Sequence, residues 1–298
     1  MIGRVTQQTL QRSTLAKLQV NLQKMSDLQA QMSGGKVITK PSDDPAGTAQ
    51  AMVLRAESRA VQQYQRNATD GIGWLTSVDT ALQSSVTSLR RARDLTVQAG
   101  DGALSTTDRE ALAVEIEATR DTLLAQANTQ YVGRSVFAGT SNADVAFTDA
   151  ASATPYAWSG TAGSSVERRI AADTTVRADA DGSSVFGEGA TSVFALLDTI
   201  AADLRSGADV TTRIDEIDTR MDSMLGELAG VGARYKQLQG TQESSAVTLQ
   251  ELTTRLSGVE DIDLAQTIVE LQMQEVAYQG ALGATSRMLQ PTLMDFLR

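Results

Sequence analysis

Histidine and cysteine, which often serve as catalytic bases, nucleophiles and metal ligands, are both absent from this 298-residue sequence. Their absence removes imidazole bases, thiolate nucleophiles and the usual ligands of zinc and copper. The chemistry that remains belongs to carboxylates, hydroxyls and glycine-rich turns. We therefore predict a protein that is not an enzyme, with no catalytic residues, no cofactor and no metal site.

Two acidic runs could still hold a metal ion. Asp43 and Asp44 are adjacent carboxylates, but no third oxygen ligand lies nearby, and Asp44 can cap a helix whose first residue is Pro45. Asp179 to Gly182 resembles the start of a calcium loop, but Ser184 stands where that loop requires glycine. We expect a helix cap at the first run and a turn at the second.

Two closely spaced glycine pairs could be mistaken for a dinucleotide-binding turn. Gly71 and Gly73 form one pair, and Gly230 and Gly232 form the other. Each lacks the third glycine and the preceding strand of that turn. We interpret both pairs as places where a helix packs closely or bends.

The main structural signal is a long apolar stripe between Ile214 and Val259. Steps of three and four residues from Ile214 land on apolar side chains at twelve of fourteen positions. A stripe of this length predicts one long helix whose apolar face another helix must cover. We therefore expect a mainly α fold, a long coiled-coil bundle formed by the N- and C-terminal segments, with a small β-rich inserted domain.

Shorter stripes with the same spacing occur near both ends of the chain. The candidate assembly residues on these two terminal arms are Leu15, Leu18, Leu22, Met25 and Met32 in the first, and Leu264, Ile268, Leu271, Glu275, Tyr278, Leu282, Leu289 and Phe296 in the second. Each stripe is too narrow to stabilise a lone helix in water. We predict that the arms pack on other helices when the protein assembles.

The charges of the two arms favour pairing. Residues 1–40 carry six basic residues and one acidic residue, whereas residues 261–298 carry five acidic and two basic residues. If the arms pack antiparallel with equal helical rise, facing residue numbers add to about 300. Lys24 would then lie near Glu275.

Composition divides the chain into three expected parts. Residues 1–40 with 261–298 form the terminal coiled-coil arms, and residues 41–145 with 191–260 form a helical bundle domain. Residues 146–190 form the β-rich insert, because short strand-like patches alternate there with Gly, Ser and Thr. A net charge of −10 argues against nucleic acid as the main partner, and no apolar run is long enough to span a membrane.

Several motifs, in order, resemble the flagellin superfamily. They are Ser33 to Ala46 (SGGKVITKPSDDPA), Asn67 to Gly71 (NATDG), Arg93 to Ala99 (RDLTVQA) and the tail from Asp263 to Arg298. Within the superfamily, the paired prolines of the first motif and Gly133 to Thr140 (GRSVFAGT) are more similar to the hook–filament junction proteins than to flagellins. The resemblance covers roughly residues 1–145 and 210–298.

The resemblance implies a secreted structural subunit of the bacterial flagellum, located outside the cell at the hook–filament junction and required for motility. It implies export through the type III flagellar apparatus, and it implies four partners: hook-associated protein 1, flagellin, further copies of the chain in a ring, and an export chaperone. A flagellin filament subunit is the alternative within the same class. A soluble coiled-coil signalling module would fit the heptads alone, but it gives no reason for matching stripes at both ends.

Overall fold

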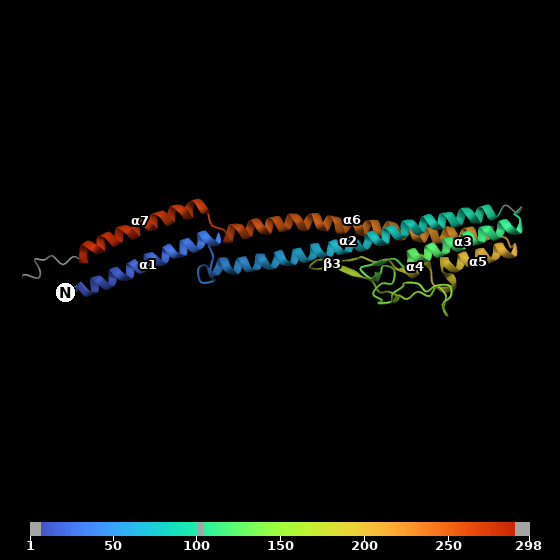
Figure 1. The fold of residues 1–298 in the computed structure, drawn as a ribbon, viewed down its shortest axis with the longest axis horizontal. Helices are drawn as coiled ribbons and strands as arrows, with labels where there is room; N and C mark the ends of the chain where they lie inside the picture. The colour runs from blue at the N-terminus through green and yellow to red at the C-terminus, as the bar shows by residue number, and fades with distance from the viewer. Residues whose placement is uncertain (1–6, 101–103, 290–298) are drawn as a thin grey trace, which may run out of the picture. The chain divides into compact units, whose positions relative to one another are not determined.

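The computed structural model describes residues 7–100 and 104–289. The chain forms two compact units. Unit 1 contains Met1–Arg59 and Leu249–Arg298, and unit 2 contains Ala60–Thr248. The helices are α1 (Gln7–Gly34), α2 (Pro45–Ala99), α3 (Thr106–Ala127), α4 (Gly182–Phe186), α5 (Val193–Ser206), α6 (Ile214–Glu260) and α7 (Leu264–Leu289), with short 3₁₀ turns η1 (Gly189–Thr191) and η2 (Thr211–Arg213) (Figure 1).

The mainly helical fold with a small strand-containing insert is confirmed. The strands form two antiparallel hairpins, β1 (Gln130–Tyr131) with β2 (Arg134–Ser135), and β3 (Glu167–Ala171) with β4 (Thr174–Arg177). The three-part division into arms, bundle and insert stays a prediction, because the two compact units divide the chain at other places.

The ends of the helices follow the expected local signals. Asp44 Oδ1 accepts hydrogen bonds from the backbone N–H groups of Ala46 and Gly47 at 3.0 and 2.9 Å, and Pro45 is the first residue of α2. At the other end of the chain, Asp263 Oδ1 accepts from two N–H groups at the start of α7 in the same way. The helix α1 ends at Gly34, and Gly35 has a φ of +68°, which favours glycine.

The long stripe of α6 lies against other parts of the protein as predicted. Ile217, Met224, Val231 and Leu238 are fully or almost fully buried, and the stripe positions between them are half-buried except for Tyr235. In unit 2, Arg93 on α2 donates to Asp218 on α6, with Nε 2.6 Å from Oδ1. Burial of a continuous stripe is what makes so long a helix stable.

The first glycine pair lies inside α2 at points of close packing. A Cβ added to Gly71 would lie 2.9 Å from a methyl group of Leu238, and one added to Gly73 would lie 2.4 Å from the hydroxyl of Tyr131. The absence of a side chain therefore lets α6 and the β1–β2 hairpin approach α2. Both distances support the packing interpretation of this pair.

The insert shares its core with the helices of unit 2. Phe147 and Phe186 are buried against Phe194 of α5, with ring centroids 5.3 and 5.8 Å apart from it. Tyr156 donates from its hydroxyl to Asp198 of α5 at 2.6 Å, and burial together with this hydrogen bond raises the pKa of Tyr156. Helices α3 and α5 lie side by side (Figure 1). The aromatic cluster thus ties the insert to the bundle.

None of the helices in the described part of the chain has the length and apolarity needed to span a membrane.

Candidate assembly interface

The two terminal arms pack against each other in unit 1. Helices α1 and α7 run side by side in opposite directions (Figure 1). Gln274 Nε2 donates to the backbone carbonyl of Asn21 at 3.3 Å, which fixes one level of the pair. The predicted antiparallel arrangement of the arms is therefore present in the structure.

The contact line between the arms includes only part of each predicted stripe. Leu18 is buried, and Met25, Met32, Leu271 and Tyr278 are half-buried along this line. The other residues of the line were not named as assembly residues, because most are small or polar: Thr14, Asn21, Leu28 and Gln31 on α1, and Thr267, Gln274, Ala281 and Thr285 on α7. Their spacing of three and four residues was the only signal that could have revealed them.

The remaining predicted residues lie on the outside of the arm pair. Leu15, Leu22, Leu264, Ile268 and Leu282 are between 37% and 58% exposed. The pairing of α1 with α7 therefore leaves these side chains uncovered in the single chain. An apolar stripe that is wider than one line of contact can place either of its edges against a partner helix. When α1 and α7 pack together, each helix buries only one edge of its stripe. A role of these residues in assembly stays a prediction.

Three of the arm positions need separate comment. Glu275 is exposed and carries its charge on the outer surface of α7. Leu289 is the last residue of α7. Phe296 lies outside the described residues, so its predicted place in the interface has no structural counterpart here.

A second apolar stripe on α7 escaped the sequence reasoning. Val269, Met273 and Val276 follow one another at spacings of four and three residues, and all are between 54% and 68% exposed. Together with Leu264, Ile268 and Leu282 they leave apolar side chains exposed where α1 does not cover α7. Exposed apolar patches of this kind mark interaction sites.

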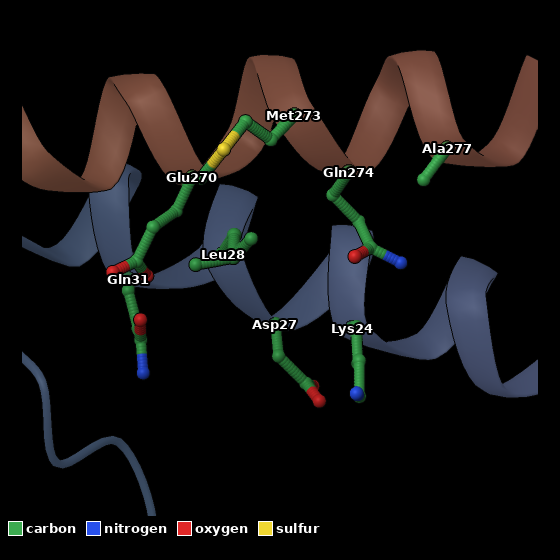
Figure 2. Close-up of a pocket in the computed structure, with 8 residues that line it drawn as sticks. All are labelled: Lys24, Asp27, Leu28, Gln31, Glu270, Met273, Gln274 and Ala277. Atoms are coloured by element: carbon green, nitrogen blue, oxygen red, sulfur yellow. The ribbon is translucent and has the colours of Figure 1, made fainter.

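A groove between the arms lies at the level of Lys24 (Figure 2). It has a volume of about 580 Å³, and its charged lining residues are Lys24 and Asp27 on α1 and Glu270 on α7. The α7 residues that line this groove are Glu270, Met273, Gln274 and Ala277. Glu275 is not one of them, because a step of one residue from Gln274 rotates a helical side chain by about 100°.

At the base of the arms, the two chain segments that leave α1 and α6 cross and bond to each other. The backbone N–H of Val37 donates to the carbonyl of Glu260 at 2.7 Å, and the N–H of Ile262 donates to the carbonyl of Gly35 at 3.2 Å. Between them Lys36 faces Asp261 in a single antiparallel bridge. The segment that precedes α7 is thus hydrogen-bonded to the segment that follows α1.

The side chain of Glu260 is buried within this crossing. Its Oε2 lies 2.5 Å from Lys36 Nζ, and its Oε1 lies 2.6 Å from Arg55 Nη2 on α2. Burial alone would raise the pKa of Glu260, but the hydrogen bonds from Lys36 and Arg55 outweigh it and hold the pKa below its ordinary value. The carboxylate is therefore ionised and paired at neutral pH.

The acidic runs considered as metal sites have other roles. Asp43 Oδ2 accepts from Thr39 and from the N–H of Lys40, each at 2.8 Å, and these bonds lower the pKa of Asp43. Asp181 caps α4, and Asp179 pairs with Arg177 at 2.8 Å. Among the described residues no cluster of three or more acidic, histidine or cysteine side chains could hold a metal ion.

Comparison with known proteins bears on the family of the chain. A model of the bacterial flagellin N-terminal helical region matches residues 5–142, which include α1, α2 and α3. Those residues are similar to the N-terminal helical region of bacterial flagellins. Flagellar hook-associated protein 3 of Escherichia coli (strain K12) is 27% identical over 309 residues, which cover 93% of this chain and 96% of that protein. The chain is thus similar to a flagellar hook-associated protein along nearly its whole length.

Two further similarities are informative. The flagellin of Bacillus subtilis (strain 168) is 24% identical over 277 residues, which cover 90% of each chain. A solved structure of a flagellar hook-associated protein from Vibrio parahaemolyticus superposes with a TM-score of 0.67 at 22% identity, and it covers 74% of this chain and 100% of its own. At 22% identity, the match to the Vibrio parahaemolyticus structure shows a shared fold alone.

In this flagellin-like chain the N-terminal family region supplies only one half of the arm pair. Residues 5–142 contain α1 and Lys36 but neither α7 nor Glu260. The arm pair and the crossing at its base therefore join that region to the opposite end of the chain. Lys36, Arg55 and Glu260 were not predicted as a group, since 205 or more residues separate Glu260 from its two partners.

Proposed function

We propose that this protein is a structural subunit of the bacterial flagellum that joins the hook to the flagellin filament. The observation that carries the proposal is the likeness to hook-associated protein 3, which extends over 93% of this chain and 96% of the relative. A likeness of that extent includes both arms, and the arms are where this chain has apolar surface left to cover.

The arms supply the physical means of assembly. Val269, Met273 and Val276 on α7, with Leu15 and Leu22 on α1, remain exposed after α1 and α7 have packed together. Covering apolar surface contributes about 25 cal/mol per Å² removed from water. Arms of neighbouring copies, packed around one another, would cover these side chains, so that a ring of subunits forms.

Four partners follow from this role. The ring would bind hook-associated protein 1 on one side and the first flagellin subunits on the other, with further copies of the chain beside it. Before assembly an export chaperone would cover the apolar arm, and the chain would leave through the type III flagellar export apparatus. The protein would therefore act outside the cell, as part of the flagellum.

Deleting the gene from its own bacterium tests the proposal. A junction protein is needed for flagellin to attach, so the mutant should have hooks without filaments and should release flagellin into the medium. Restoring the gene should restore filaments and motility. Filaments of normal length on the mutant would contradict a junction role.

A flagellin filament subunit is the second candidate, and the match to Bacillus subtilis flagellin over 90% of each chain favours it. Purified protein separates the two. A flagellin should extend long filaments when short filament fragments are added as seeds, whereas a junction protein should bind to fragment ends and stop. Electron microscopy of the seeded samples gives the answer directly.

A further inference from the structure

We propose that Glu260 is a register lock for the terminal arms: its buried carboxylate, held by Lys36 and Arg55, sets which residues of α1 face which residues of α7. The proposal concerns the single chain and does not depend on the function proposed above. It follows from three features of unit 1.

The first feature is the crossing itself. The hydrogen bonds Val37 to Glu260 and Ile262 to Gly35 lie on either side of the facing pair Lys36 and Asp261. In an antiparallel pair without a slip, the numbers of facing residues add to one constant value, and these three pairs share it. Asn21 and Gln274, about 20 Å further along the arms on equal helical rise, depart from that value by only two. The register at the base therefore continues into the arms.

The second feature is the mixed composition of the contact line between the arms. Large residues such as Leu18 and Tyr278 alternate there with small or polar ones, among them Asn21, Thr267 and Ala281. Large interlocking side chains distinguish one register from the next, whereas small residues at repeated spacing fit several. A register signal from outside the contact line would therefore add to the selection made by the large side chains.

The third feature is the burial and pairing of Glu260. Its side chain is only 4% exposed, and its two oxygens pair with cations from different segments, Lys36 after α1 and Arg55 on α2, which are 44% and 50% exposed. A slip of the crossing that separates this buried carboxylate from both cations would leave its charge unpaired. Buried ion pairs add little net stability, but an unpaired buried charge is costly, so such a pair selects one arrangement over its neighbours.

An ion pair whose carboxylate is exposed cannot select one arrangement over another in this way. Arg91 and Glu115 in unit 2 form an ion pair whose side chains are 59% and 44% exposed. Water solvates each of these charges when the pair separates, so a change of arrangement costs little. Glu115 is therefore the matched control for Glu260.

The test uses thiol cross-linking in the full-length chain, which has no cysteine of its own. One reporter carries Asn21→Cys with Gln274→Cys, the pair in register. Two others carry Asn21→Cys with Thr267→Cys or with Ala281→Cys, each displaced by seven residues or about 10 Å along α7. A short bismaleimide is added to dilute protein, and the ratio of in-register to displaced cross-linking is measured by gel electrophoresis.

With Glu260 present, the in-register pair should dominate. Glu260→Gln should reduce the ratio by about fivefold or more, because it removes the charge that the crossing positions. Glu115→Gln should leave the ratio unchanged. Lys36→Met keeps the alkyl chain but not the ammonium group, and it should also reduce the ratio. If Glu260→Gln prevents folding, the Lys36→Met variant provides the test.

Two results would overturn the proposal. An unchanged ratio in both Glu260→Gln and Lys36→Met would show that the arms set their own register. Loss of all three cross-links together would show that Glu260 holds the arms to each other without choosing between registers. Circular dichroism of each variant checks that the helices are retained.

Discussion

Apolar side chains remain exposed in the arm pair of unit 1, whereas similar side chains are buried in the aromatic core of unit 2. In unit 2, Leu197 of α5 is completely buried. In the arms, Leu282 of α7 is 43% exposed, and Val276 on the same helix is 68% exposed. The two helices are comparably apolar, but α5 has α3, α6 and the insert around it, whereas α7 has α1 alone.

This difference separates stability from assembly. A completed core stabilises the single chain, because its apolar surface is already removed from water. An incomplete one leaves surface that only another chain can cover, and exposed apolar patches of this kind mark interaction sites. Substitutions in the two regions should therefore affect different measurements.

The largest effect on stability is expected from truncating a core leucine of unit 2. Leu197→Ala should lower the free energy of unfolding by about 2–5 kcal/mol, since it removes buried methyl groups and leaves a cavity. Leu282→Ala is the matched change in the arm, and its cost should be below about 0.5 kcal/mol. Urea denaturation followed by circular dichroism measures both. Equal costs would remove the contrast between the regions.

Polar substitution on α7 should produce the reverse pattern. Val269→Ser combined with Val276→Ser should leave the monomer melting temperature nearly unchanged, because both side chains are already exposed. The same double variant should abolish filament formation in a strain that lacks the native gene. Gln272→Ser combined with Gln279→Ser places the same new residues at exposed polar positions of α7 and should support normal motility. Normal motility in the valine variant would exclude this stripe from assembly.

Acid should loosen the crossing at the base of the arms, but only below the ordinary pKa of a glutamate. Lys36 and Arg55 hold the pKa of Glu260 below its ordinary value in the folded protein. The stabilisation from this group is therefore present above the ordinary pKa of a glutamate, about 4.3, and is lost as the pH falls through the lower pKa of the folded state.

Hydrogen exchange of the Val37 and Ile262 amides measures this loss. Between neutral and acid pH, opening at these amides should increase in the unmodified chain, after correction for intrinsic exchange. In Glu260→Gln it should be raised already at neutral pH and should vary less with acid. The difference between the two proteins removes the contribution of other carboxylates near the crossing, such as Asp43, whose pKa is lowered by its hydrogen bonds from Thr39 and Lys40. Identical pH profiles in the two proteins would assign the effect to groups other than Glu260.

The smallest expected change is a gain in stability at the β1–β2 hairpin. Val132 and Gly133 have φ values of +50° and +74°, and Val132 is 81% exposed. A β-branched residue is strained at positive φ, whereas Asn followed by Gly is the favoured pair in such two-residue turns. Val132→Asn should therefore raise the unfolding free energy by about 1 kcal/mol. A loss of stability would mean that Val132 makes a contact that offsets its strain.

Local signals set several of the helix ends, and the cap at Asp44 and Pro45 was predicted from spacing alone. Asp44, Asp263 and Gly35 act on backbone groups within a few residues, so neighbouring positions carry the signal. The stripe of α6 was predictable for a related reason. A helix of that length with one apolar face has one way to bury it.

Spacing could not decide which face of each arm meets the other. On α7 several stripes satisfy the same three and four residue rule, and the contact line includes the polar residues Thr267 and Gln274 in place of Ile268 and Glu275. Spacing also could not predict that Glu260 contacts Lys36 and Arg55, which lie 224 and 205 positions away in the sequence. The sequence by itself therefore determined the elements and their ends, because those depend on nearby backbone groups. Only the tertiary structure decided the facing surfaces and the buried ion pair, because both depend on how distant segments of the chain are brought together.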